Sequence, residues 1–178
     1  TGCCAAAAAV AAFEALVSGN FQDPVSVNLP RGETPTFALS RAEAAGDGFQ
    51  AGIIKDAGDD PDVTHGAEII ALGEPGPADS GVTFRAGDGV GTVTLPGLPL
   101  AVGEPAINPA PRQIITANLE AAVERLGHAC DVIVTISIPG GQVLAEKTMN
   151  GRLGIKGGLS VLGTTGVIIP YSCASWIH

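Results

Sequence analysis

The sequence has few basic residues. Nine lysines and arginines stand against eighteen aspartates and glutamates, which gives a formal net charge of −9 at pH 7. No run of lysine or arginine occurs anywhere in the chain. Proteins that bind nucleic acid use a basic surface to neutralise phosphate groups. The composition therefore argues against nucleic acid as a partner.

The sequence also lacks the signals of membrane, secreted and metal-binding proteins. The uncharged stretch 157–177 is broken by glycines, a proline and several hydroxyl side chains, so it is unsuited to a lipid bilayer. No basic segment precedes the alanine-rich start, so no secretory signal is visible. The four cysteines have neither zinc-site spacing nor the density of a disulfide framework. We therefore expect a cytoplasmic protein with no membrane contact and no metal of its own.

Aromatic residues make up 4% of the chain and charged residues 15%, whereas hydrophobic residues reach 46%. This balance is the opposite of that in disordered chains and predicts a folded protein. A length of 178 residues suits one domain or slightly more. The 25 glycines indicate many tight turns or close backbone approaches, which often surround ligands.

The order of the expected elements indicates an α+β fold with a mostly antiparallel sheet and a few packed helices. An alanine-rich helix is expected over 5–17, ending at Gly19, and a second helix over 112–126, ending at Gly127. In the second helix Ile115, Leu119, Ala122, Val123 and Leu126 share one face. Strands are expected at 25–29 and 36–39, which form a hairpin, and at 49–54, 68–72, 82–85, 90–95 and 131–138.

The last residues resemble the start of another element. Ser172 is a suitable N-cap, but only one helical turn follows it before the sequence ends. We therefore expect a domain over 1–171, with 172–178 beginning a helix that leads to a further C-terminal α/β domain.

The loop 55–66, KDAGDDPDVTHG, concentrates four aspartates and a histidine between two strands. Crowded carboxylates shift one another's pKa values, so Asp59 and His65 are candidate catalytic residues and Lys55 a candidate substrate ligand. A solvated turn that caps itself is an equally simple interpretation, because Gly58, Asp60 and Pro61 are typical turn residues. A metal site is the weakest alternative, since no calcium-loop or zinc spacing is matched.

Two further loops carry candidate ligands. Glu104, Asn108 and Arg112 lie in a proline-rich connection, and Arg112 near a helix start would bind an anion together with free backbone N–H groups. Alternatively, Arg112 faces solvent or pairs with Glu104. Gly87, Gly89 and Gly91 form a G-x-G-x-G run followed by a β-rich segment, which favours a turn entering a strand over a dinucleotide site.

The segment 150–166, NGRLGIKGGLSVLGTTG, joins many glycines with two basic side chains. It could cradle a carboxylate or a phosphate, but it lacks the ending of a P-loop. Arg152 and Lys156 are candidate substrate ligands, and Gly163, Thr164 and Thr165 candidate cofactor contacts.

At these same residues the chain resembles the cobalt-precorrin-5B C-1 methyltransferases, the CbiD family of anaerobic cobalamin biosynthesis. The matching runs are TGCCAAAAA, KDAGDDPDVTHGAEI, GDGVGTVTLPGL, VGEPAINPAPR, VTISIPGG and NGRLGIKGGLSVLGTTG. The resemblance implies methylation of C-1 of cobalt-precorrin-5B, giving cobalt-precorrin-6A, with S-adenosylmethionine as methyl donor and cobalt only as part of the substrate. It also implies a first domain related to ribosomal-protein and GHMP-kinase folds, followed by a smaller α/β domain that this sequence lacks.

Two other classes of function stay open on the residues alone. A non-catalytic tetrapyrrole-binding module would keep the carboxylate-binding loops without using a methyl donor. A phosphate-binding enzyme would use the glycine-rich loops, with Asp59 or Asp60 on Mg²⁺.

Overall fold

The protein is described by a computed structural model that covers residues 1–163. The predicted cofactor contacts Thr164 and Thr165 and the predicted terminal segment 172–178 lie outside the described residues.

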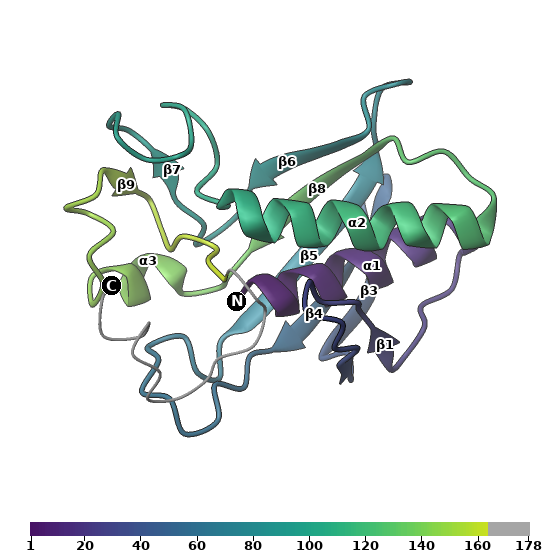
Figure 1. The fold of residues 1–178 in the computed structure, drawn as a ribbon, viewed down its shortest axis with the longest axis horizontal. Helices are drawn as coiled ribbons and strands as arrows, with labels where there is room; N and C mark the ends of the chain where they lie inside the picture. Colours follow the sequence, from purple (N-terminus) through teal and green to yellow (C-terminus); the bar gives the residue numbers. More distant parts are fainter. Residues whose placement is uncertain (164–178) are drawn as a thin grey trace.

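The centre of the fold is a five-stranded sheet in the order β3-β4-β5-β8-β6 (Figure 1). Its strands are β3 (Arg41–Ala45), β4 (Gly48–Ile54), β5 (Glu68–Pro75), β6 (Val82–Ala86) and β8 (Val132–Ser137). The first four strands in this order pair antiparallel, and β6 is parallel to β8. The expected α+β class with a mostly antiparallel sheet is confirmed.

Helix α1 (Gly2–Ser18) packs on the sheet against β4 and β5, and α2 (Pro109–Leu126) packs beside it (Figure 1). Every residue of α1 from Gly2 to Ala15 is buried. Small alanine side chains permit this close packing, and Gly19 ends the helix in the left-handed conformation. The predicted alanine helix and its stop are confirmed, although the helix begins three residues earlier than expected.

Helix α2 begins at Pro109, not at residue 112 as predicted. Prolines are accepted in a first turn because the N–H groups there have no partner within the helix. The predicted buried face is correct for Ile115, Leu119 and Ala122. It is wrong for Leu126, the last residue of α2, which is 37% exposed.

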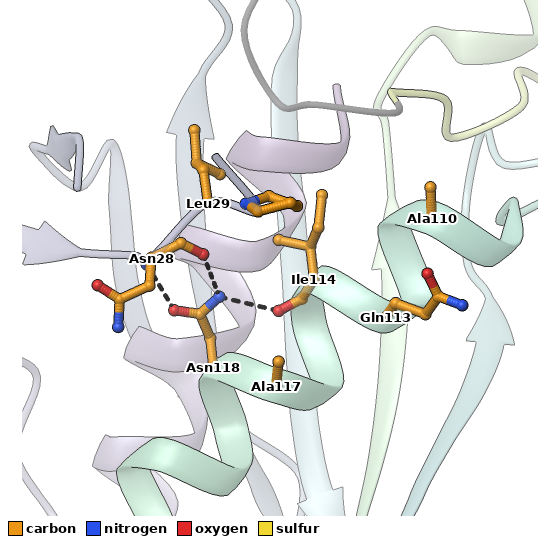
Figure 2. Close-up of a pocket in the computed structure, with 8 residues that line it drawn as sticks. Asn28, Leu29, Ala110, Gln113, Ile114, Ala117 and Asn118 are labelled. Carbon is orange, nitrogen blue, oxygen red and sulfur yellow. Dashed lines mark hydrogen bonds between the residues drawn. The ribbon is translucent and has the colours of Figure 1, made fainter. Parts of the chain in front are cut away.

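Asn118 joins α2 to the segment that follows β1 (Val25–Ser26), the first strand of the expected hairpin with β2 (Thr36–Phe37). The Asn28 N–H donates to Asn118 Oδ1 at 2.7 Å, and Asn118 Nδ2 donates to the Asn28 carbonyl at 2.8 Å (Figure 2). Asn118 Nδ2 also donates to the Ile114 carbonyl at 2.9 Å. The side-chain amide thus pairs with the backbone of the segment. An open groove of about 410 Å³ lies between the two elements.

Three short elements surround the end of the sheet: α3 (Gly141–Ala145), and β7 (Thr92–Val93) paired with β9 (Ile155–Lys156). The strand predicted at 90–95 is therefore wrong in extent, with two residues in place of six. β3, β9 and α3 were not predicted. The sequence of β3, RAEAA, has low intrinsic β-propensity, and it forms a strand because its whole length pairs with β4.

Three glycines allow the loops at this end to cross in direct backbone contact. A Cβ on Gly141 or on Gly158 would lie 2.2 Å from the Gly89 carbonyl oxygen. Gly89 itself has φ +72°, and a Cβ there would lie 1.9 Å from the Ile138 oxygen. The Val90 N–H donates to the Gly87 carbonyl at 3.2 Å, so the G-x-G-x-G run forms the expected turn before β7.

Candidate functional site

A cavity of about 410 Å³ lies at the N-terminal end of α1. It brings together the start of α1, the aspartate-rich loop between β4 and β5, and the glycine-rich segment that contains β9. The lining residues are Thr1, Asp62, Val63, Thr64, Thr148, Met149, Asn150, Leu153, Leu159, Ser160, Leu162 and Gly163. Two loops that the sequence analysis singled out separately thus form one site.

The polar wall of the cavity is built on Lys55, the first residue after β4. Its side chain is 3% exposed and donates to Asp62 Oδ2 and, at 2.7 Å, to Thr64 Oγ1. Asp62 Oδ1 accepts from the Thr64 N–H at 2.7 Å and from the Thr64 hydroxyl at 2.6 Å. A buried ammonium needs such partners, because an unpaired buried charge is strongly unfavourable. Lys55 and Thr64 therefore hold the Asp62 carboxylate in one orientation.

The environment keeps Asp62 ionised. Partial burial of the carboxyl acts to raise its pKa, but the hydrogen bonds from Lys55 and from the side chain and backbone of Thr64 outweigh burial. The pKa falls from 3.8 to about 2. Its side chain remains 26% exposed, so a fixed negative charge lines the cavity at neutral pH.

Asn150 organises the part of the wall formed by the glycine-rich segment. Its side chain is buried, and its Oδ1 accepts a hydrogen bond from the Ser160 hydroxyl at 3.3 Å. Its carbonyl accepts from the Ile155 N–H at 2.9 Å, which closes the turn before β9. The Gly2 N–H donates to the Leu162 carbonyl at 2.9 Å and joins this wall to α1.

The rim of the cavity is apolar. It is lined by four large hydrophobic side chains that are between 41% and 57% exposed: Val63, Met149, Leu153 and Leu162. Such exposure is unusual for large hydrophobic side chains gathered at one place.

Two cysteines lie in the first turn of α1. Burial raises the pKa of the Cys3 thiol to about 11 and also raises the pKa of the Cys4 thiol. Both thiols stay protonated at neutral pH and act as small apolar groups, not as nucleophiles.

Asp59 and His65, the residues predicted to be catalytic, lie outside the cavity lining. The Asp59 side chain is exposed, and His65 is 57% exposed. His65 Nδ1 accepts from the Ala57 N–H at 3.1 Å, and Asp56 accepts from the Gly58 N–H at 2.8 Å. The tip of the loop thus has the hydrogen bonds of a turn that caps itself, and no contact in the described residues assigns it a reaction.

Arg112 adopts the alternative arrangement, in which it pairs with Glu104. Its Nη1 lies 2.8 Å from Glu104 Oε2, while Nε donates to the Ile107 carbonyl at 2.7 Å and Nη2 to the Pro105 carbonyl at 3.1 Å. The guanidinium also lies 5.5 Å from the centre of the Phe84 ring. Free N–H groups were expected beside Arg112, but its own N–H donates to the Asn108 carbonyl, and Pro109 and Pro111 have none.

The remaining predicted ligands lie in the proline-rich connection and in the glycine-rich segment. The Asn108 N–H donates to the Val161 carbonyl at 3.1 Å and thereby joins the proline-rich connection to the glycine-rich segment. Gly163 lines the cavity. Arg152, next in sequence to the lining residue Leu153, is exposed on the turn before β9, and Lys156 is exposed within β9. Among residues 1–163, no group of three or more histidine, cysteine, aspartate or glutamate side chains is placed to hold a metal ion.

The family model named CbiD matches residues 1–170 of the chain. The chain belongs to the CbiD family. Over its full length it is 60% identical to a protein of Paramagnetospirillum magneticum and 57% identical to one of Brucella anthropi, both named cobalt-precorrin-5B C(1)-methyltransferase. It covers 50% and 48% of those proteins, so it spans about half the length of the curated relatives it matches.

The fold also matches a solved CbiD structure. The crystal structure of the cobalamin biosynthesis protein CbiD from Archaeoglobus fulgidus superposes with a TM-score of 0.71 at 31% identity. The match covers 99% of this chain and 55% of that one. Within the described part of the chain, no helix is both long and apolar enough to cross a membrane.

Several residues of the cavity were missed by the sequence analysis. Asp62 was counted only as one of four crowded aspartates, and Thr64, Asn150 and Ser160 were not singled out. One signal was available for Asp62: an aspartate followed two residues later by threonine is typical of a carboxylate that accepts a nearby backbone N–H. No local pattern marks Asn150, because its partners come from the fold of the whole segment.

Proposed function

We propose that the protein takes part in S-adenosylmethionine-dependent methylation of C-1 of cobalt-precorrin-5B, in the cytoplasm. The observation that carries this proposal is 60% identity, along the whole chain, to a protein named for that reaction. The cobalt ion belongs to the substrate. When bound, S-adenosylmethionine supplies an electrophilic methyl group on a positively charged sulfur.

The cavity at the start of α1 supports the proposal chemically. Transfer of a methyl group to carbon depends mainly on holding two reactants in line in a site that excludes water, so few reactive side chains are needed. The described lining combines apolar side chains with an ionised carboxylate, four hydroxyl groups and the amide of Asn150. At about 410 Å³, the cavity suits one small ligand of the kind that pockets of this size enclose.

The corrin substrate needs a wider surface than this cavity. We propose that the apolar rim formed by Val63, Met149, Leu153 and Leu162 contacts one face of the macrocycle. The exposed side chains of Arg152, next in sequence to Leu153 of this rim, and of Lys156 in β9 would then pair with carboxylates at the edge of the ring. The part of the relatives' length that this chain does not span, which we expect to be a smaller α/β domain, would close the site from the other side.

Asp59 and His65 keep the role proposed for them at the reacting end of the substrate, where a proton must be removed. Their exposed positions at the tip of the loop suit a group that meets a substrate entering from solvent.

Calorimetric titration of the whole natural protein with S-adenosylmethionine, with a cobalt-corrin precursor and with ATP–Mg²⁺ tests the proposal against its rivals. We expect the first two ligands to bind and the third not to bind. Binding of the corrinoid alone would instead indicate a tetrapyrrole-binding module. Binding of ATP–Mg²⁺ alone would indicate a phosphate-binding enzyme.

A further inference from the structure

We propose that the Asp62 carboxylate binds the α-ammonium group of S-adenosylmethionine, with Lys55 and Thr64 as positioning residues. The inference rests on the proposed function and adds to it the place of the methyl donor. Nothing at the tip of the aspartate-rich loop is needed for it, because Asp62 is the one aspartate of the loop among the described lining residues of the cavity.

Asp62 distinguishes the cavity chemically from its apolar rim. Among the described lining residues, Asp62 has the only ionisable side chain. Its charge is paired with the buried Lys55 ammonium, so a cationic ligand would be held by a directed hydrogen bond to a free acceptor position and not by a net negative charge. No described lining residue has a basic side chain to pair with a carboxylate, so we assign the macrocycle to the apolar rim.

Asp62 has capacity for one more hydrogen bond. A carboxylate offers about four acceptor positions, two on each oxygen. Thr64 uses two positions on Oδ1, and Lys55 uses one on Oδ2. The remaining position on Oδ2 belongs to a side chain that is 26% exposed and lines the cavity. An ammonium group, which only donates, is the complementary partner.

The rate of the reaction favours the amino group over the sulfonium as the partner of Asp62. The positive charge on sulfur disappears as the methyl group leaves, so a carboxylate beside it would stabilise the ground state more than the transition state. The charge of the α-ammonium group does not change during the transfer. Pairing Asp62 with this group adds binding energy without slowing the chemical step.

Lys55 is absent from the cavity lining and acts through Asp62, and Thr64 holds the Asp62 carboxylate through two hydrogen bonds to Oδ1. The Lys55 side chain is 3% exposed, and both of its hydrogen bonds within the described residues go to Asp62 and Thr64. Removal of its ammonium would free the carboxylate to turn toward solvent. The expected consequence is weaker binding of ligands that carry the amino group, with no change for ligands that lack it.

The test is a double-mutant cycle in the whole natural protein, with S-adenosylhomocysteine and its deaminated analogue as the two ligands. In the unsubstituted protein, loss of the amino group should weaken binding about 10- to 150-fold, the range for a hydrogen bond to a charged group. In D62N both ligands should bind with nearly equal affinity. K55M should show a smaller difference between the two ligands than the unsubstituted protein.

D60N is the matched control, because Asp60 lies in the same loop, and its side chain makes no hydrogen bond or ion pair within residues 1–163. It should behave like the unsubstituted protein. Equal affinity for both ligands in the unsubstituted protein overturns the inference without recourse to any variant that might misfold. The inference is also overturned if removal of the amino group from the ligand weakens binding equally in D62N and in the unsubstituted protein. Absence of binding by S-adenosylmethionine itself would contradict the proposed function.

Discussion

Arg112 is held by contacts with four different partners, and each restricts the orientation of its guanidinium. Two backbone carbonyls accept hydrogen bonds from it, Glu104 pairs with it, and the Phe84 ring lies beneath it. The planar guanidinium can satisfy all of these at once, which a lysine ammonium cannot. Arg112 thus fastens the proline-rich connection to the start of α2.

We expect R112Q to lower the free energy of unfolding by about 1 to 3 kcal/mol, because two carbonyls lose their donor in a partly buried place. R112K should recover only part of this loss. Urea denaturation followed by circular dichroism measures both. R152Q, at an exposed position, is the control and should change stability little. Normal stability of R112Q with weakened corrinoid binding would instead make Arg112 a substrate ligand.

Asp62 makes stability depend on pH in acid. Its pKa is about 2 in the folded protein and near 3.8 when unfolded, so the unfolded state binds the proton more readily. The stabilisation is therefore complete above the unfolded pKa and is lost as the pH falls from about 4 to 2. We expect about 1 to 2 kcal/mol, reduced by solvent screening of an exposed quarter of the side chain.

Unfolding measured between pH 5 and pH 2 should show this loss in the unsubstituted protein and a smaller loss in D62N. In D60N the free energy of unfolding should fall with decreasing pH as it does in the unsubstituted protein. If the free energy of unfolding of D62N also falls with decreasing pH to the same extent, the ion pair with Lys55 does not contribute to stability in acid.

At the residue scale, the sequence indicated which loops gather polar groups but not which of their members meet. The four aspartates of the loop 55–66 are equivalent in sequence. Only the fold makes Asp62 the partner of a buried lysine and leaves Asp59 in solvent. Arg112 and Glu104 lie eight positions apart in an irregular segment, where no helical or strand spacing indicates contact.

At the scale of elements, backbone crossings position the cavity wall. Gly89 lies where the turn before β7 touches both the start of α3 and the turn after β9. We expect G89A to destabilise the protein by about 2 to 5 kcal/mol, because the added methyl group meets the Ile138 carbonyl and φ is positive.

G46A provides the comparison for G89A. Gly46 has φ +59° with nothing within 4 Å of its added Cβ, so it should show the backbone cost alone, about 1 to 2 kcal/mol. Thermal unfolding of the two variants distinguishes these effects. Similar losses in both would mean that the crossing can relax and that close approach is not required at Gly89.

The long elements could be predicted because local signals agree with the fold. α1 has strong helix formers and a terminal glycine, and β8 alternates buried and half-buried residues. β3 could not be predicted, since its alanine and glutamate residues favour no strand without β4. The two-residue strands β7 and β9 depend on each other across more than sixty residues, a contact that local patterns do not encode.

At the scale of the whole molecule, the two long helices pack with the sheet to form the core, and the loops at one end of the sheet form the cavity and its apolar rim. The aspartate-rich loop, the start of α1 and the glycine-rich segment meet there although they are far apart in sequence. The family resemblance carried by the sequence runs predicted the fold class and the family, and the comparisons confirm both. The reaction itself remains a proposal.

The most direct test of that proposal is methyl transfer by the whole natural protein. The protein is incubated with cobalt-precorrin-5B and S-adenosylmethionine carrying a ¹³C-labelled methyl group, and the corrinoid product is analysed by mass spectrometry and carbon NMR. The account predicts one labelled methyl group, bonded to C-1, together with an equal amount of S-adenosylhomocysteine. An unlabelled corrinoid, recovered from a folded protein that binds both reactants, would contradict it.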